Sequence, residues 1–244
     1  MDENTAFRVV LRYAHLEDQL IDFFRHIPPQ DANLNAWSPT LASLIKESCG
    51  LFESFLKRIS RQTVLVEGKS KRKTELDIHD LGFLYSRMLG LTRRKVMFIY
   101  SFPPEYRDPF KSWKNKVRRK FYKPPKWWTT HNHLKHNELS SMNEATATTA
   151  IDALAGLLLT IGSAPEMTRA LIHQDLLHWR MVQQDVIVER ALAGFPETNR
   201  PVVLKTKLFA IILGGPPVPK DINNFRPVAH TQTHVLDPYF RRLM

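Results

Sequence analysis

The chain has 244 residues, of which 43% are hydrophobic and 24% are charged, so it can build a sizeable core and is not an intrinsically disordered chain. Its formal net charge of +11 favours a polyanionic partner, nucleic acid first and an anionic membrane surface second. A basic protein without such a partner would have the same composition.

The single cysteine, Cys49, excludes an intramolecular disulfide and a thiolate metal cluster. Its apolar neighbours predict a buried structural thiol. The N-terminus begins with Asp2 and Glu3, unlike the basic and then apolar layout of a signal peptide. The longest apolar stretch, around residues 151–161, is too short to cross a bilayer. We therefore expect a cytoplasmic protein with no membrane span.

Apolar residues at intervals of three and four predict two long helices, over residues 5–26 and 39–60. Two prolines, at 28 and 29, end the first helix. Ser38 is a good cap for the second, with a proline in its first turn. These helices form a large part of the expected core.

The next part of the chain is less regular. Residues 62–73 are expected to form a loop, because they contain Gly68 and a run of basic residues. A third helix is predicted over residues 77–89. The apolar run at residues 96–100 indicates a short β-like segment.

A strongly cationic helix is expected after Asp108 and Pro109. We assign its apolar face to the core, and that face carries Phe110, Trp113, Val117 and Phe121. The basic side chains on its other faces are Lys111, Lys114, Lys116, Arg118, Arg119, Lys120 and Lys123. Clustered Lys and Arg residues are typical of a surface that follows phosphates, so we predict that these seven residues bind RNA or another polyanion. A solvated helix face would show the same pattern.

The C-terminal half predicts two further helices, over residues 143–161 and from Ser163 to about residue 193. Residues 204–213 alternate weakly and indicate a short strand. Prolines after residue 214 predict an irregular extension. The fold class expected from these elements is all-α, an antiparallel helical bundle. It would comprise a single helical domain over residues 1–195 and a Pro-rich C-terminal extension over residues 196–244.

The segment WWTTHNHLKHNE, residues 127–138, combines bulky anchors with titratable groups. A helix that starts near its tryptophans would place Asn132 and His136 one turn apart on one face, with Lys135 on a neighbouring face. These three residues are our candidates for catalysis, because such a face can bind phosphate or support acid–base chemistry. In a purely structural alternative, Asn132 and His136 hydrogen-bond to neighbouring helix ends.

The order of motifs around this segment resembles a known family. The pattern PFxxW from Pro109, then WW, then NxxKH from Asn132, followed by an Ala-rich helix, is similar to bacterial proteins of unknown function related to the HEPN superfamily. The similarity covers roughly residues 75–162. It implies an antiparallel α-bundle, often dimeric, of a kind found among RNA-cutting toxins, antiphage systems and non-catalytic RNA-binding relatives.

The resemblance also bears on catalysis. In catalytic HEPN proteins, an arginine stands four to six intervening residues before a histidine that corresponds to His136. Here Thr129, Thr130 and His131 fill the arginine positions. Lys135 does not offer the bidentate fork of arginine. We therefore expect binding rather than ribonuclease activity.

Three hypotheses follow from the sequence. The leading one is a HEPN-like protein that binds RNA or another polyanion through the cationic helix and the face bearing Asn132, Lys135 and His136. The second is a metal-independent ribonuclease of the toxin type, with His136 as general acid or base. The third is a structural or regulatory protein that forms a homodimer through the Ala-rich helix 144–161.

We expect no cofactor and no metal. The chain has no glycine-rich phosphate loop and no nucleophile elbow. His230, His234 and Asp237 have a spacing that suits a metal site on a helix, but the nearby prolines disfavour a helix there.

Overall fold

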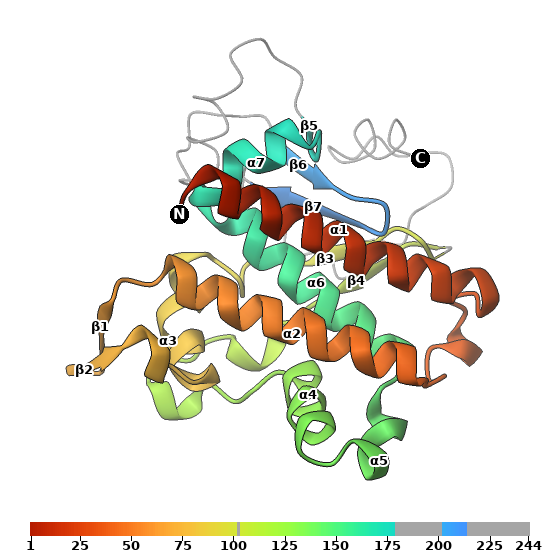
Figure 1. Ribbon diagram of the computed structural model, residues 1–244, viewed down its shortest axis with the longest axis horizontal. Coiled ribbons are helices and arrows are strands. Elements are labelled where there is room, and N and C mark those ends of the chain that lie inside the picture. The colour runs from red at the N-terminus through yellow and green to blue at the C-terminus, as the bar shows by residue number, and fades with distance from the viewer. Residues whose placement is uncertain (102, 179–201, 214–244) are drawn as a thin grey trace.

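The computed structural model describes residues 1–101, 103–178 and 202–213 (Figure 1). The helices are α1 (Glu3–His26), α2 (Pro39–Ile59), α3 (Ile78–Met88), α4 (Lys126–His136), α5 (Glu138–Ser141), α6 (Ala147–Ser163) and α7 (Thr168–His173). The strands are β1 (Thr63–Val66), β2 (Lys69–Arg72), β3 (Val96–Phe98), β4 (Glu105–Arg107), β5 (Leu177–His178), β6 (Val202–Lys205) and β7 (Phe209–Leu213).

The three helices predicted in the first 90 residues are confirmed as α1, α2 and α3. The side chains of Asp2 and Ser38 each accept a hydrogen bond from the backbone N–H three residues on, which satisfies a donor in the first turn of α1 and α2. Asp77 and Asp80 form a capping box at the start of α3. These are local signals, which is why the sequence predicts these helices well.

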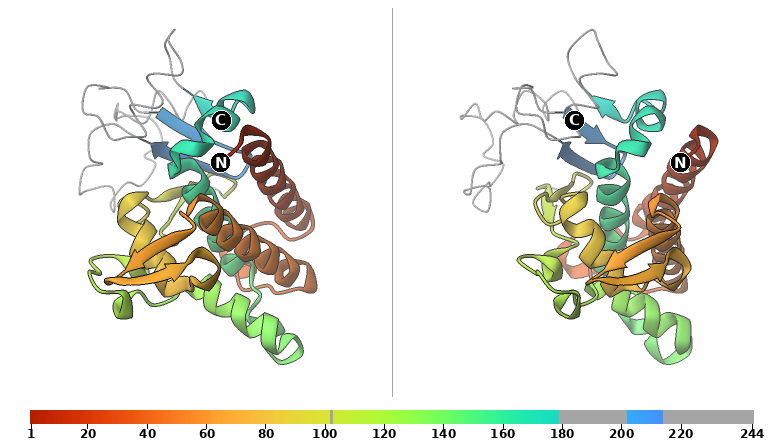
Figure 2. Two further views of the ribbon diagram at one scale, coloured as in Figure 1. Left: turned by 60° about the vertical axis from the view of Figure 1, so that its left-hand side comes forward. Right: turned by 90° about the vertical axis from the view of Figure 1, so that its left-hand side faces the viewer.

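Helix α6 is the centre of the core. It lies between α1 and α2 on one side and a five-stranded sheet on the other (Figure 2). Fifteen of its 17 residues are buried. Small residues allow this close packing, since a Cβ added to Gly156 would lie 3.1 Å from the ring of Trp127. The homodimer expected through residues 144–161 would need these side chains at the surface, and they are buried inside one chain.

The five-stranded antiparallel sheet contradicts the all-α fold class. Its strand order is β4-β3-β7-β6-β5. Strand β3 lies within the β-like run predicted at residues 96–100. The single strand predicted at residues 204–213 is instead divided between two strands, β6 and β7. Met97 pairs with Ala210, so the sheet joins distant parts of the chain. Periodicity in a short apolar run reveals neither its type nor its partner, and the fold is therefore a helix-rich α/β architecture rather than a bundle.

The loop expected over residues 62–73 is also a wrong prediction, because it contains the β1–β2 hairpin. Glu67 and Gly68 occupy its two-residue turn with φ of 46° and 79°. This turn fits the right-handed twist of the two strands. The hairpin projects from the end of the molecule that carries α3 (Figure 1).

The helix predicted from Ser163 to residue 193 is shorter and broken in the structure. A 3₁₀ turn at Pro165–Met167 precedes α7, and β5 follows it. Residues 179–201 and 214–244 lie outside the described residues. Most of the expected extension falls there, and so do the three residues whose spacing suits a metal site, His230, His234 and Asp237. Over the described ranges, no lone helix combines the length and the hydropathy of a membrane span, and the one pair that does so jointly, Ala147–Ser163 with Pro165–His173, is bent by 87°.

Candidate nucleic-acid interface

The cationic segment between β4 and α4 is not the helix that the sequence predicts. It contains only two 3₁₀ turns, Lys111–Trp113 and Arg119–Phe121, joined by irregular backbone. Asn115 adopts a positive φ of 58°, which a continuous helix does not allow. The predicted face is divided as a result: Phe110 and Trp113 are buried, but Val117 and Phe121 are 63% and 48% exposed.

Buried aromatic side chains fix the path of this segment. The indole N–H of Trp113 donates to the carbonyl of Lys123 at 2.9 Å. The hydroxyl of Tyr122 donates to the carbonyl of Lys116 at 2.8 Å. Both rings pack against Gly82 of α3, where an added Cβ would lie 3.0 Å from each of them. The loop is therefore held in one shape by its own side chains and by α3.

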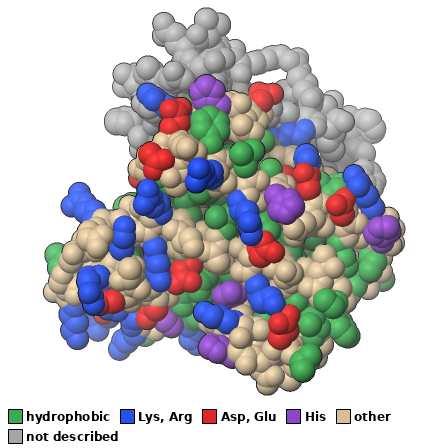
Figure 3. All heavy atoms as spheres, in the orientation of Figure 1, with side chains coloured by type: hydrophobic (Ala, Val, Ile, Leu, Met, Phe, Trp, Pro, Cys, Tyr) green, Lys and Arg blue, Asp and Glu red, His purple; other side chains and the backbone are tan. Residues whose placement is uncertain are grey.

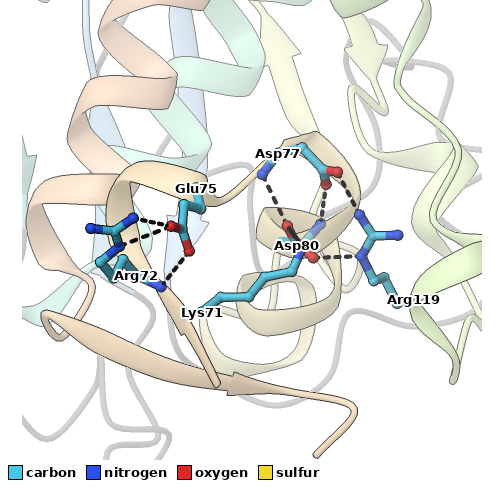
Figure 4. Close-up of polar contacts among 6 residues, drawn as sticks. All are labelled: Lys71, Arg72, Glu75, Asp77, Asp80 and Arg119. Carbon is cyan, nitrogen blue, oxygen red and sulfur yellow. Dashed lines mark hydrogen bonds and ion pairs between the residues drawn. The ribbon is translucent and has the colours of Figure 1, made fainter. Parts of the chain in front are cut away.

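A buried carboxylate ties the second 3₁₀ turn to α3 (Figure 4). The side chain of Asp80 has no exposed surface, and it accepts hydrogen bonds from Arg119 Nε at 2.5 Å and Lys71 Nζ at 2.8 Å. Arg119 Nη2 also donates to Asp77 at 2.5 Å. Burial alone would raise the pKa of Asp80, but the hydrogen bonds from Arg119 and Lys71 outweigh it and lower the pKa to about 2. Arg119 and Lys71 therefore neutralise a buried charge.

Two of the seven cations predicted to bind RNA are used within the protein. Arg119 pairs with Asp77 and Asp80, and Lys114 pairs with Asp108. The other five make no ion pair with any described residue, and neither does Lys69 on the β1–β2 hairpin. We call these six residues the basic surface: Lys69, Lys111, Lys116, Arg118, Lys120 and Lys123.

The hairpin and the cationic segment meet directly. The Glu67 side chain, in the hairpin turn, accepts a hydrogen bond from the backbone N–H of Arg119 at 3.0 Å. At the other end of the segment, the Ser112 hydroxyl donates to the carbonyl of Lys123 at 3.1 Å. Lys and Arg side chains gather over this end of the molecule, around the hairpin (Figure 3). Cations from different parts of the sequence are thus brought onto one surface.

The charge of the whole chain is concentrated in this part of the sequence. Residues 61–126 contain 18 Lys and Arg against 6 Asp and Glu, a net charge of +12, whereas the complete chain carries +11. The remaining residues are therefore nearly neutral, with a net charge of −1. A net charge so unevenly distributed produces a positive potential on one face rather than a uniform one.

Helix α4 starts at the tryptophan pair, and both tryptophans are structural. Trp127 donates its indole N–H to the carbonyl of Pro109 at 3.0 Å and packs edge-on against Phe52. Trp128 also packs against Phe52 and is buried. Burial lowers the pKa of His131, which is on the inner side of the helix, and the nearby charge of Lys135 acts in the same direction.

The candidate catalytic residues share α4 but do not form a catalytic arrangement. Asn132 is half-buried, and Lys135 and His136 are exposed. None of the three side chains forms a hydrogen bond or an ion pair with another described residue. The neighbouring His133 pairs instead with Glu144 at 2.9 Å, and Lys46 pairs with Glu138 at 2.8 Å, so this surface carries both signs of charge. No described residue orients His136 as a general acid or base.

Sequence reasoning missed a second charged group, where β4 meets α6. Arg107 Nη1 lies 3.8 Å from the Asp152 carboxylate, and Arg107 Nη2 lies 3.0 Å from Glu105. Burial raises the pKa of Asp152 to about 6, although the charge of Arg107 opposes the shift. Arg107 Nε and Asp108 Oδ1 are buried and have no hydrogen-bond partner among the described residues. These groups come from separate elements, so no local pattern predicts the cluster.

No further chemistry is evident at these surfaces. Within the three described ranges, no group of three or more His, Cys, Asp and Glu residues is placed to hold a metal ion. Comparisons with models of known protein families, with curated proteins and with solved structures found no match. The function has to be inferred from the chemistry of the basic surface itself.

Proposed function

We propose that this protein binds RNA or another polyanion in the cytoplasm through its basic surface. The observation that carries the proposal is a group of six cations that make no ion pair with any described residue, within the cationic segment and the hairpin that contacts it, in the part of the sequence with a large net positive charge. Each phosphate neutralised by Lys or Arg releases condensed counterions, which is the main driving force for sequence-independent binding.

The internal ion pairs support this assignment. Arg119 and Lys114 satisfy acidic groups of the protein, whereas the six cations of the basic surface, five of them exposed and Lys116 half-buried, have no acidic partner among the described residues. Holding like charges close together is costly unless a polyanion can approach them. The segment is also held in shape by Trp113 and Tyr122, which reduces the ordering cost of binding.

Two features direct the proposal towards RNA and binding rather than cleavage. The similarity of residues 109–136 to HEPN-related proteins favours RNA among polyanions. The ribonuclease alternative gains no support from α4, because His136 has no orienting partner among the described residues. Asn132, Lys135 and His136 are therefore assigned at most a supporting role in binding.

The test is the affinity for a short fluorescein-labelled RNA, measured by anisotropy over a range of salt concentrations. We expect binding at low ionic strength that weakens steeply with salt. The double variant Arg118→Gln/Lys120→Gln should lower the magnitude of the slope of log K against log salt by about 1–2. Both side chains are exposed, so the fold should be unaffected.

The matched control removes two exposed arginines outside the basic surface, on α1 and α7: Arg8→Gln/Arg169→Gln. It has the same net charge as the test variant and should bind nearly as tightly as the wild type. Equal losses in the two variants would mean that net charge, and not the basic surface, drives binding. Absence of binding at low salt to both the RNA and heparin, a second polyanion, would rule out the proposal.

A further inference from the structure

Phe121 is the aromatic residue of the cationic segment that faces solvent. Its neighbours Trp113 and Tyr122 are almost completely buried, whereas 48% of Phe121 is exposed. The 3₁₀ turn at Arg119–Phe121 explains the difference, because it directs Tyr122 into the core and leaves the preceding ring outside. Single apolar side chains are common on protein surfaces, so what matters for Phe121 is how the ring is held and which groups lie beside it.

The backbone that carries this ring is held from both sides. Arg119 is fixed by Asp80 and Asp77, and its backbone N–H is bound by Glu67. The residue after the ring, Tyr122, accepts a hydrogen bond from Ser86 at 3.2 Å. The ring therefore projects from a turn that is anchored at Arg119 and at Tyr122, which is the arrangement that a preorganised contact requires.

One cation contacts the exposed ring, and others are near it in the sequence. The ammonium of Lys120 lies over one face of the Phe121 ring, 5.1 Å from its centroid, and Arg118 and Lys123 are within three residues of it in the chain. An exposed aromatic ring beside several cations that have no acidic partner among the described residues is the composition of a site for single-stranded nucleic acid, in which the cations contact the phosphates and a base stacks on the ring. Bases in a duplex are already stacked on each other and do not offer a free face.

We propose that the basic surface recognises single-stranded nucleic acid, and that one base stacks on Phe121 while Arg118, Lys120 and Lys123 contact the flanking phosphates. This inference rests on the proposed function and specifies its substrate class. Stacking does not depend on base identity, so the contact would give preference for single strands over duplexes without strong sequence preference.

The experiment compares three probes of equal length at one salt concentration: single-stranded RNA, duplex RNA and a single strand of abasic sites. Wild-type protein should bind the single-stranded RNA most tightly. Phe121→Ala should weaken this binding by about 10-fold, with little change for the duplex or the abasic strand. Phe121→Trp should retain the preference, because it keeps an aromatic face.

Val117→Ala is the matched control, since Val117 is 63% exposed in the same segment and has no aromatic ring. It should bind all three probes as the wild type does. Circular dichroism and thermal unfolding of Phe121→Ala should match the wild type, because the removed ring is not part of the core.

The other outcomes separate this inference from the proposed function. If Phe121→Ala binds single-stranded RNA normally while Arg118→Gln/Lys120→Gln does not, the polyanion site stands and the stacking contact is refuted. A uniform loss with all three probes would refute it too. If Phe121→Ala changes only the sedimentation of the protein, the ring is a protein contact. If the wild type binds none of the probes, the proposed function itself fails.

Discussion

Asp80 illustrates how a single buried charge organises the candidate interface. Its carboxylate is fully buried, and burial of an unpaired carboxylate would cost several kcal/mol. Arg119 and Lys71 compensate for that cost, and they come from the cationic segment and the β1–β2 hairpin. One carboxylate on α3 therefore holds together two of the segments that build the basic surface (Figure 4).

We expect Arg119→Ala to lower the free energy of unfolding by about 2 kcal/mol, because Asp80 loses one of its two cationic partners. Urea unfolding monitored by circular dichroism measures this effect. The control is Arg118→Ala: its side chain is exposed and has no ion-pair partner among the described residues, so we expect a change below about 0.5 kcal/mol. Equal effects of the two variants would contradict the role given to Asp80.

Asp80 and Asp152 should make the folding stability depend on pH in opposite directions. The pKa of Asp80 is lowered to about 2, so its contribution to stability is complete above the unfolded pKa of 3.8 and is lost as the pH falls through about 2. The pKa of Asp152 is raised to about 6, so the folded state holds this proton more tightly than the unfolded state. Stability should therefore fall as the pH rises from about 4 to about 6 through Asp152.

Asp152→Asn removes the loss of stability that Asp152 causes as the pH rises. We expect the variant to be more stable than the wild type at pH 7, by about 1 kcal/mol because the carboxylate is 30% exposed, and equally stable near pH 3.5. Urea midpoints at the two pH values give the comparison. The exposed Asp31→Asn serves as the control and should follow the wild type at both. A larger gain in stability for Asp152→Asn at pH 3.5 than at pH 7 would contradict a raised pKa of Asp152.

At the scale of elements, α3 acts as the support for the cationic segment. Its N-terminus provides Asp77 and Asp80, and Gly82 leaves room for two aromatic rings one turn further on. The loop has almost no regular secondary structure, so these side-chain contacts supply the order that backbone hydrogen bonds supply in a helix. Substitutions in α3 should therefore weaken the proposed RNA binding even when no Lys or Arg residue is replaced.

Gly82→Ala tests this support. The added Cβ would lie 3.0 Å from both Trp113 and Tyr122, and overpacking of this kind costs about 1–3 kcal/mol. We expect lower stability in urea unfolding and weaker RNA binding. Gly50→Ala, in α2, is the opposite case, since no atom lies within 4 Å of its added Cβ. It should be neutral or stabilise the protein by up to about 1 kcal/mol, owing to the higher helix propensity of alanine.

At the scale of the whole molecule, the β6–β7 hairpin is part of the same core as the N-terminal helices. Glu17 of α1 accepts hydrogen bonds from the backbone N–H groups of Leu208 at 2.9 Å and Lys207 at 3.3 Å. Phe209 packs against Phe98 of β3, and Phe98 packs against Phe24 of α1. These contacts join residues up to 191 positions apart, which is why the pairing of the strands cannot be assigned from local sequence alone.

The apolar core and the excess positive charge lie largely in different parts of the molecule. Helices α1, α2 and α6 build a core of small, aliphatic and aromatic residues, while the end that carries α3 and the hairpin holds the excess of Lys and Arg. Most of the core therefore lies outside the part of the chain that carries the proposed binding, although Trp113 and Tyr122 belong to both. This separation makes the charge-removal and aromatic variants informative, because they change the surface and leave the core intact.

The sequence by itself determined the helices that depend on local rules. Ser38 caps α2, Asp77 starts α3, and the tryptophan pair marks the start of α4, because capping and apolar periodicity act within one or two turns. It also located the part of the chain that carries the proposed binding function. The expected cationic helix was wrong because the contacts of Trp113 and Tyr122 with α3 fix another path, with Asn115 in a left-handed conformation, and periodicity does not reveal those contacts.

Only the tertiary structure decided which of those cations are free. Arg119 is neutralised by Asp80, 39 residues away, whereas its neighbours Arg118 and Lys120 face solvent. The same holds for Phe121, which the pattern assigns to the core and the fold places at the surface. Pairing, burial and strand partners arise from contacts between distant residues, and a local pattern does not contain that information.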